Sequence, residues 1–129
     1  MNDLSQEVFE AVSEAVAKDF PDITIRVNQF RARPRLPALL MTFDLPSETP
    51  GTRDSAGEAW SRCRLTCEAY SSTSLGEARA IIAAADEVLG AMGFSRSKYA
   101  TVPDADEQIR RVRCVWRASF GRHHDVAAW

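Results

Sequence analysis

The side chains that most often do chemistry are few in this sequence and lie far apart. Cys63 and Cys67 are four residues apart in a predicted strand, so they face one side about 13 Å from each other, at about 3.3 Å per residue. That separation is too long for one disulfide or one zinc ion, so we interpret both, and Cys114, as buried free thiols. His123 and His124 are adjacent near the C-terminal end, where side chains of an extended segment diverge. We interpret them as part of a solvated tail.

The remaining candidate ligands are carboxylates. Asp104, Asp106 and Glu107 resemble a calcium-binding loop only loosely, because the glycine and the closing glutamate of that motif are missing. The sequence also contains no glycine-rich phosphate loop. We therefore predict no catalytic residue, no metal site and no cofactor, and we expect that the protein is not an enzyme.

The pattern with the most physical content is basic. Only Lys18 and Lys98 among the 16 basic residues are lysines. The planar guanidinium of arginine pairs with carboxylates and phosphates and suits contact surfaces, although a GC-rich genome would produce the same bias. If two of the predicted strands share a sheet, one face of that sheet carries Arg62, Arg64, Arg111, Arg113 and Arg117. Two interpretations stay open: a solvated face that also carries Glu68 and other acids, or a surface that meets a neighbouring subunit or lines a passage for DNA.

Composition places the chain among ordinary globular proteins. It has 129 residues, the usual size of one domain, with 45% apolar and 26% charged residues. No apolar run approaches the roughly 20 residues that a membrane-spanning helix needs, and the polar, acidic start does not resemble a secretory signal. The net charge of −2 argues against nucleic-acid binding by the entire surface. We expect a protein of the cytoplasm, or of a particle assembled there, with no membrane partner.

Hydrophobic periodicity predicts two helices and four strands. Residues 4–20 have helical spacing, with Asp3 and Gln6 as an N-cap arrangement. Ser74 and Glu77 form a capping box for a second helix that Gly93 ends. Alternating runs predict strands at Ile23–Val27, Ala38–Asp44, Trp60–Tyr70 and Ile109–Phe120. Residues 45–58 form a polar loop, a second polar stretch follows Phe94, and residues 121–129 form a tail.

This order, α-β-β-β-α-β, predicts an α+β fold. Two amphipathic helices can cover one face of a four-stranded, mainly antiparallel sheet, which buries both helix stripes economically. We expect a single domain over residues 1–129, with its core in residues 4–120.

Several local patterns resemble the tail terminator, or tail completion, proteins of long-tailed bacteriophages, over residues 4–120. The strand RLTCEAYSSTS leads into the capped helix LGEARAIIAAADEVLGAM, which contains the pair Glu77-Ala78. The step Gly93-Phe94-Ser95-Arg96 then precedes an acidic loop and an arginine-rich last strand. The tail that ends in Trp129 has no counterpart with an evident role in the family's ring.

The resemblance implies a structural protein of the virion that assembles in the host cytoplasm. Such a protein forms a homo-oligomeric ring, a hexamer, which ends growth of the tail tube and forms the tail side of the head–tail joint. Its expected partners are other copies of itself, the tail tube protein and a head–neck connector protein, with DNA passing through the ring. The loop at residues 45–58 would then reach a neighbour, and its charged residues join the arginines as predicted interface residues: Glu48, Arg53, Asp54 and Glu58.

Other functions stay open. A related head–tail connector or minor tail protein has the same α+β character. A small nucleic-acid-binding module would use the arginine-rich sheet face, and its affinity for DNA would fall steeply with salt.

Overall fold

The computed structural model describes residues 5–29, 34–44, 61–104, 106–120 and 126–127. The predicted cap at Asp3, the loop at 45–58 and the histidine pair at 123–124 lie outside these residues. The helices are α1 (Ser5–Asp19) and α2 (Leu75–Ala91). The strands are β1 (Thr24–Val27), β2 (Ala38–Asp44), β3 (Ser61–Ser71), β4 (Ser95–Val102), β5 (Arg110–Phe120) and β6 (Val126–Ala127).

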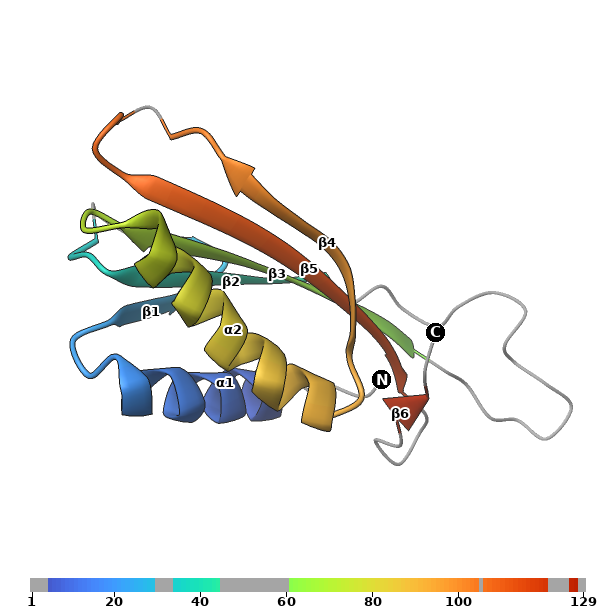
Figure 1. Cartoon of the computed structure of the whole chain (residues 1–129). Helices are drawn as coiled ribbons and strands as arrows, with labels where there is room; N and C mark the ends of the chain where they lie inside the picture. The colour runs from blue at the N-terminus through green and yellow to red at the C-terminus, as the bar shows by residue number, and fades with distance from the viewer. Residues whose placement is uncertain (1–4, 30–33, 45–60, 105, 121–125, 128–129) are drawn as a thin grey trace, which may run out of the picture.

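One mixed sheet, with both helices on the same face, forms the described fold (Figure 1). The strand order is β1-β2-β3-β5-β4, and β6 pairs with the C-terminal end of β5. Only β1 and β2 run parallel; every other neighbouring pair is antiparallel. The two central strands, β3 and β5, pair over their full length from Ser61 opposite Phe120 to Ser71 opposite Arg110.

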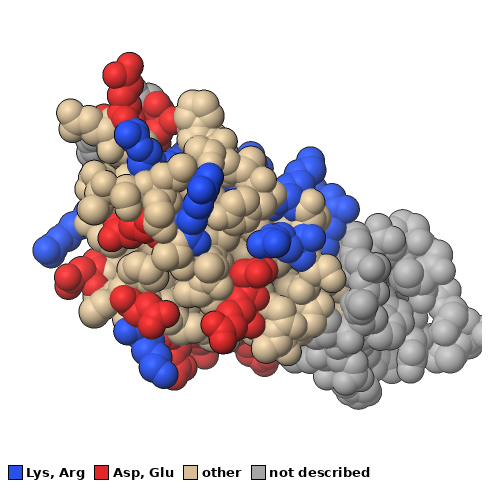
Figure 2. All heavy atoms as spheres, viewed as in Figure 1, with Lys and Arg blue, Asp and Glu red and all other residues tan. Residues whose placement is uncertain are grey.

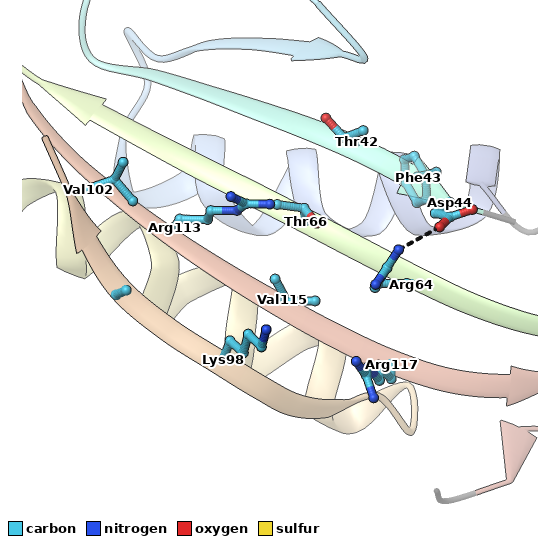
Figure 3. Close-up of a pocket in the computed structure, with 11 residues that line it drawn as sticks. Thr42, Phe43, Asp44, Arg64, Thr66, Lys98, Val102, Arg113, Val115 and Arg117 are labelled. Atoms are coloured by element: carbon cyan, nitrogen blue, oxygen red, sulfur yellow. Dashed lines mark hydrogen bonds and ion pairs between the residues drawn. The ribbon is translucent and has the colours of Figure 1, made fainter. Parts of the chain in front are cut away.

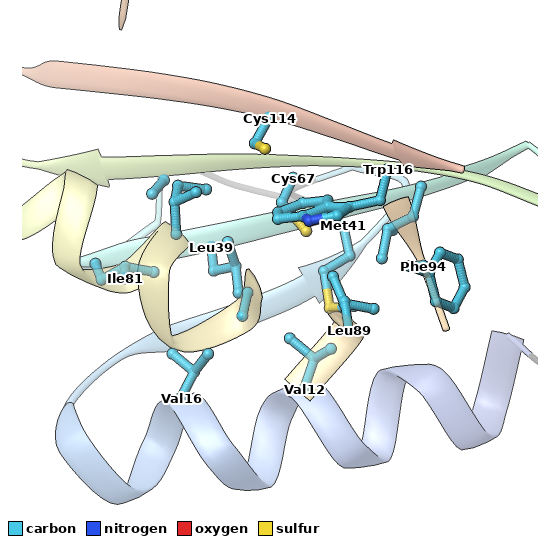
Figure 4. Close-up of a cluster of buried hydrophobic side chains, with 14 of the residues drawn as sticks. Val12, Val16, Leu39, Met41, Cys67, Ile81, Leu89, Phe94, Cys114 and Trp116 are labelled. Atoms are coloured by element: carbon cyan, nitrogen blue, oxygen red, sulfur yellow. The ribbon is translucent and has the colours of Figure 1, made fainter. Parts of the chain in front are cut away.

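The core lies between the helices and the inner face of the sheet, the face that the helices cover (Figure 4). The valines of α1 recur every four residues at positions 8, 12 and 16 and are fully buried. Among the described residues, Trp116 is the largest fully buried side chain, and its indole Nε1 donates a hydrogen bond to Oδ1 of Asp86 at 2.8 Å. That bond satisfies the one polar atom that the indole brings into the core.

The start of α2 contains the predicted cap. The Ser74 hydroxyl accepts a hydrogen bond from the Glu77 backbone N–H at 3.0 Å, and Gly93 follows the helix with φ of 95°. The Glu77 carboxylate does not reach back to Ser74. It accepts instead from the hydroxyl of buried Ser71 at 2.6 Å, and this hydroxyl in turn accepts from the Ser74 N–H at 3.2 Å. Ser71, the last residue of β3, therefore joins this strand to the start of α2.

The prediction of four strands was wrong, because the sheet formed by the described residues has six. The polar stretch after Phe94 forms β4, in which seven of eight residues are exposed. Its sequence shows no apolar alternation, because an edge strand with exposed side chains does not need an apolar face. Backbone pairing with β5 keeps it in the sheet. The order of the elements that were predicted, and the mainly antiparallel sheet with both helices on one face, agree with the structure.

Candidate interaction surface

The outer face of the sheet, opposite the helices, carries the charged side chains. On β3 and β5 the buried residues alternate with arginine, threonine and glutamate, because successive side chains of a strand point to opposite faces. The pairing sets Arg64 opposite Arg117, Thr66 opposite Val115 and Glu68 opposite Arg113. Four of the predicted residues therefore share this face: Arg64, Arg111, Arg113 and Arg117. The side chain of Arg62, like residues 48, 53, 54 and 58, lies outside the described part of the chain.

Part of this face is concave. A hollow of about 670 Å³ crosses β2, β3, β5 and β4, and Val115, only 8% exposed, forms its apolar floor (Figure 3). Four basic side chains and one carboxylate are among its lining residues: Arg64, Lys98, Arg113, Arg117 and Asp44. We call this site the basic hollow.

The charges in the basic hollow are only partly compensated. A nitrogen of the Arg64 guanidinium donates to Oδ2 of Asp44 at 2.9 Å, but both side chains are about half exposed, at 51% and 56%, so solvent weakens this pair. Lys98 and Arg113 are exposed, and neither makes an ion pair with any described residue. The hollow therefore presents positive charge that no described group of the chain neutralises.

The other end of the outer face is neutralised internally. Nε of Arg111 donates to Oε2 of Glu68 at 2.6 Å, and the guanidinium lies 5.4 Å from the centroid of the Tyr70 ring. The Arg111 and Glu68 side chains are only 28% and 15% exposed. Burial, with the neighbouring Glu68 carboxylate, raises the pKa of Tyr70 above its ordinary value. Glu68 lies opposite Arg113 in the pairing register but binds Arg111. Arg113 is therefore not paired with Glu68 and lines the hollow.

A β-bulge brings Lys98 to the outer face. Arg96 pairs opposite Trp116, whereas Lys98 pairs opposite Val115, so Ser97 is an extra residue in β4. The Ser97 hydroxyl donates to the carbonyl oxygen of Val115 at 3.3 Å. The side chains of the residues before and after the bulge therefore point to opposite faces of the sheet. Arg96 lies 3.8 Å from a carboxylate oxygen of Asp86, which also binds the core tryptophan, while Lys98 lines the hollow. A simple alternation pattern in the sequence cannot anticipate this switch.

The thiols belong to the core and not to this surface. All three cysteines are free and buried, as predicted, and Cys67 lies directly opposite Cys114 in the pairing of β3 with β5. Burial raises the pKa of Cys63 and of Cys114 to about 12, and burial beside Cys114 raises the pKa of Cys67 further. The sequence interpretation compared Cys63 with Cys67 and missed the second pair, because strand register cannot be read from spacing.

The acidic loop between β4 and β5 uses its carboxylates locally. Oδ1 of Asp104 accepts from the Asp106 backbone N–H at 3.0 Å, and Oδ1 of Asp106 accepts from the Gln108 N–H at 2.9 Å. Aspartate commonly stabilises turns in this way. In the described residues, no group of three histidine, cysteine or acidic side chains is arranged to hold a metal ion. None of the described helices is long and apolar enough to span a membrane.

No protein-family model and no curated protein matches the chain. Among solved structures, it is similar to a chain of the virion of the native gene transfer agent particle, with a TM-score of 0.59 and 15% sequence identity. The match covers 91% of this chain and 96% of that one. At this identity the likeness shows a shared fold: the α+β arrangement described above is also that of a chain from a virus-like particle.

Proposed function

We propose that this chain is a structural protein of a phage-like virion, and that it ends tail-tube growth and forms the tail side of the head–tail joint as an oligomeric ring. The observation that carries the proposal is the fold shared with a virion chain over nearly the full length of both chains. The resemblance to tail terminator proteins over residues 4–120, carried by a strand that leads into a capped helix and by an arginine-rich last strand, supports the more specific role.

In this role the protein works by contact and not by catalysis. Its partners would be further copies of itself, the tail tube protein and a head–neck connector protein, in a ring through which DNA passes. The protein would act in the host cytoplasm during assembly and remain in the virion. The basic hollow supports a contact function, because it offers positive charge that no described residue of the chain compensates.

The test is electron microscopy of particles produced after the gene for this chain is interrupted, with the intact gene supplied on a plasmid as the control. We expect filled heads lying apart from loose tails of uncontrolled length, and normal particles in the complemented culture. Tails of normal length that fail to join heads would favour a head–tail connector instead. Normal, infectious particles without the protein would remove both functions.

A nucleic-acid-binding module is the second candidate, and the basic hollow is the observation that favours it. Binding of a DNA duplex by this face would weaken strongly between about 50 mM and 200 mM salt, because binding releases counterions from the phosphates. Fluorescence anisotropy with a labelled duplex at both salt concentrations tests this function. No binding at 50 mM salt would eliminate it.

A further inference from the structure

The molecule carries a second charged surface, of opposite sign, on the helix layer. Glu7, Glu10 and Glu14 are exposed on α1 and are spaced by three and four residues, so they lie along one side of the helix. At about 100° per residue this stripe points almost directly away from the buried valines of α1. Figure 2, which views the molecule as in Figure 1, shows acidic groups over the helix layer. We call this row the α1 acidic stripe.

The α1 acidic stripe and the basic hollow match in size. The stripe extends about 10 Å along the helix, at about 1.5 Å per residue, and a helix with its side chains is about 10–12 Å wide. The hollow spans four adjacent strands, or about 14 Å across, and extends about 13 Å along β5 from Arg113 to Arg117. The length and width of one helix are therefore comparable with those of the hollow, and Lys98 and Arg113 are among the residues that line it.

From these two surfaces we infer that the basic hollow of one copy binds the α1 acidic stripe of a second copy of this chain. Among the described residues, four basic side chains and one carboxylate line the hollow, whereas duplex-binding proteins commonly neutralise six to ten phosphates. The chain also has a net charge of −2, which opposes an approach to DNA. A partner with a short row of carboxylates on a helix suits the hollow better, and this chain supplies one.

The contact is necessarily head-to-tail. Two basic hollows repel each other, so the surface cannot pair with itself across a two-fold axis. Because the stripe and the hollow lie on opposite layers, each copy that uses one keeps the other available for the next copy. Such a contact propagates and closes into a ring when the rotation between copies allows it. Closure into a ring rests on the function proposed above, but the contact between two copies does not.

Charge reversal tests the contact. One variant carries Glu10→Lys and Glu14→Lys in the stripe, and another carries Lys98→Glu and Arg113→Glu in the hollow. We expect the wild-type protein to self-associate at low salt in analytical ultracentrifugation. In each variant the concentration for half-association should rise by about tenfold or more. Glu87→Lys with Asp22→Lys, which reverses two exposed acids elsewhere, changes the net charge as the stripe variant does and should leave association unchanged.

Mixing gives the decisive result. In an equimolar mixture, the stripe variant's lysines face the hollow variant's glutamates, and the unaltered surfaces also match, so association should return. Circular dichroism melting of each variant checks that it is folded, and a variant that does not melt cooperatively is replaced by its Gln counterpart. A wild-type protein that stays monomeric overturns the inference, as does a mixture that stays monomeric. So would variants that associate normally while the hollow variant alone loses binding to a DNA duplex.

This experiment separates the contact from the proposed function. Variants that associate like the wild type, together with unterminated tails in the gene interruption, would leave the tail role standing and remove this interface. Normal particles without the protein, together with rescue by mixing, would remove the tail role and keep the interface.

Discussion

The two faces of strand β5 have opposite properties although their residues alternate along a single segment. The inner residues, among them Cys114 and Trp116, are fully buried under the helices. The outer residues include Arg111, which binds Glu68, and Arg113 and Arg117, which line the basic hollow. The difference shows that one strand can serve both stability and contact. The side chains at its inner positions pack in the core, whereas those at its outer positions can carry charge without disturbing the core. The predictions below test how separate these two roles are.

The largest expected effect is on the inner face. Trp116→Ala removes the largest fully buried side chain and should lower the free energy of unfolding by about 3–5 kcal/mol. Arg113→Ala, three residues away on the outer face, should change it by less than about 0.5 kcal/mol. Urea denaturation of both variants measures the contrast. Equal losses would show that the outer arginine also supports the fold.

A second contrast appears at alkaline pH. Each thiol has its pKa raised by burial, so the folded chain keeps it protonated to about pH 12 at Cys63 and Cys114, while the unfolded chain loses the proton near 9.0. The stabilisation is complete below pH 9 and is lost as pH rises towards 12, by about 1.4 kcal/mol per pH unit for each thiol. Burial of Tyr70 adds a loss in the same direction.

Urea denaturation at pH 8 to 11 in reducing buffer measures this slope. Cys114→Ala should reduce the loss of unfolding free energy per pH unit by the contribution of one thiol. Lys98→Ala, on the outer face, should leave this slope unchanged. A slope that is the same in the cysteine variant would show that these thiols do not control the alkaline transition.

The next largest effect on stability is expected from the hydrogen bond between Trp116 and Asp86. Asp86→Ala removes the acceptor of the indole Nε1 and should destabilise the fold by about 1–3 kcal/mol. Asp86→Asn keeps an acceptor oxygen and should recover most of that loss, although the charge that faces Arg96 is gone. Thermal melting of the two variants separates the hydrogen bond from the charge of Asp86. An equal loss of stability in both variants would show that the charge, and not the hydrogen bond, is responsible.

The smallest expected difference lies within the outer face. Glu68→Ala leaves the partly buried Arg111 without its carboxylate and should lower stability by about 1 kcal/mol. Asp44→Ala breaks a pair that is about half exposed and should have an effect of less than about 0.5 kcal/mol. Chemical denaturation at low and high salt checks the ranking. The reverse order would mean that the hollow, and not the Arg111 end, is the structural part of this face.

Sequence reasoning succeeded where local patterns are enough. The strand at Ala38–Asp44 was predicted with its observed bounds, because Leu39, Met41 and Phe43 alternate, and Ser74 was recognised as a helix cap. The outward position of the arginines followed from the same alternation.

It failed where pairing decides the structure. The segment Ser95–Val102 has no apolar stripe and becomes a strand only because β5 has an open edge. The bulge at Ser97 then moves Lys98 into the hollow. The opposition of Cys67 and Cys114 likewise depends on register, which these local patterns do not encode. The shape of the candidate site therefore had to come from the structure.

The bulge at Ser97 has a consequence for how copies can meet. Strand β4 ends the strand path, and a regular outermost strand is a template onto which a strand of another chain can add without limit. The irregular spacing at Ser97 and the charge of Lys98 interrupt that template. The irregular edge at β4 is therefore a poor template for the addition of a strand from another copy. Contacts between copies at this edge would therefore be made by side chains and not by strand pairing.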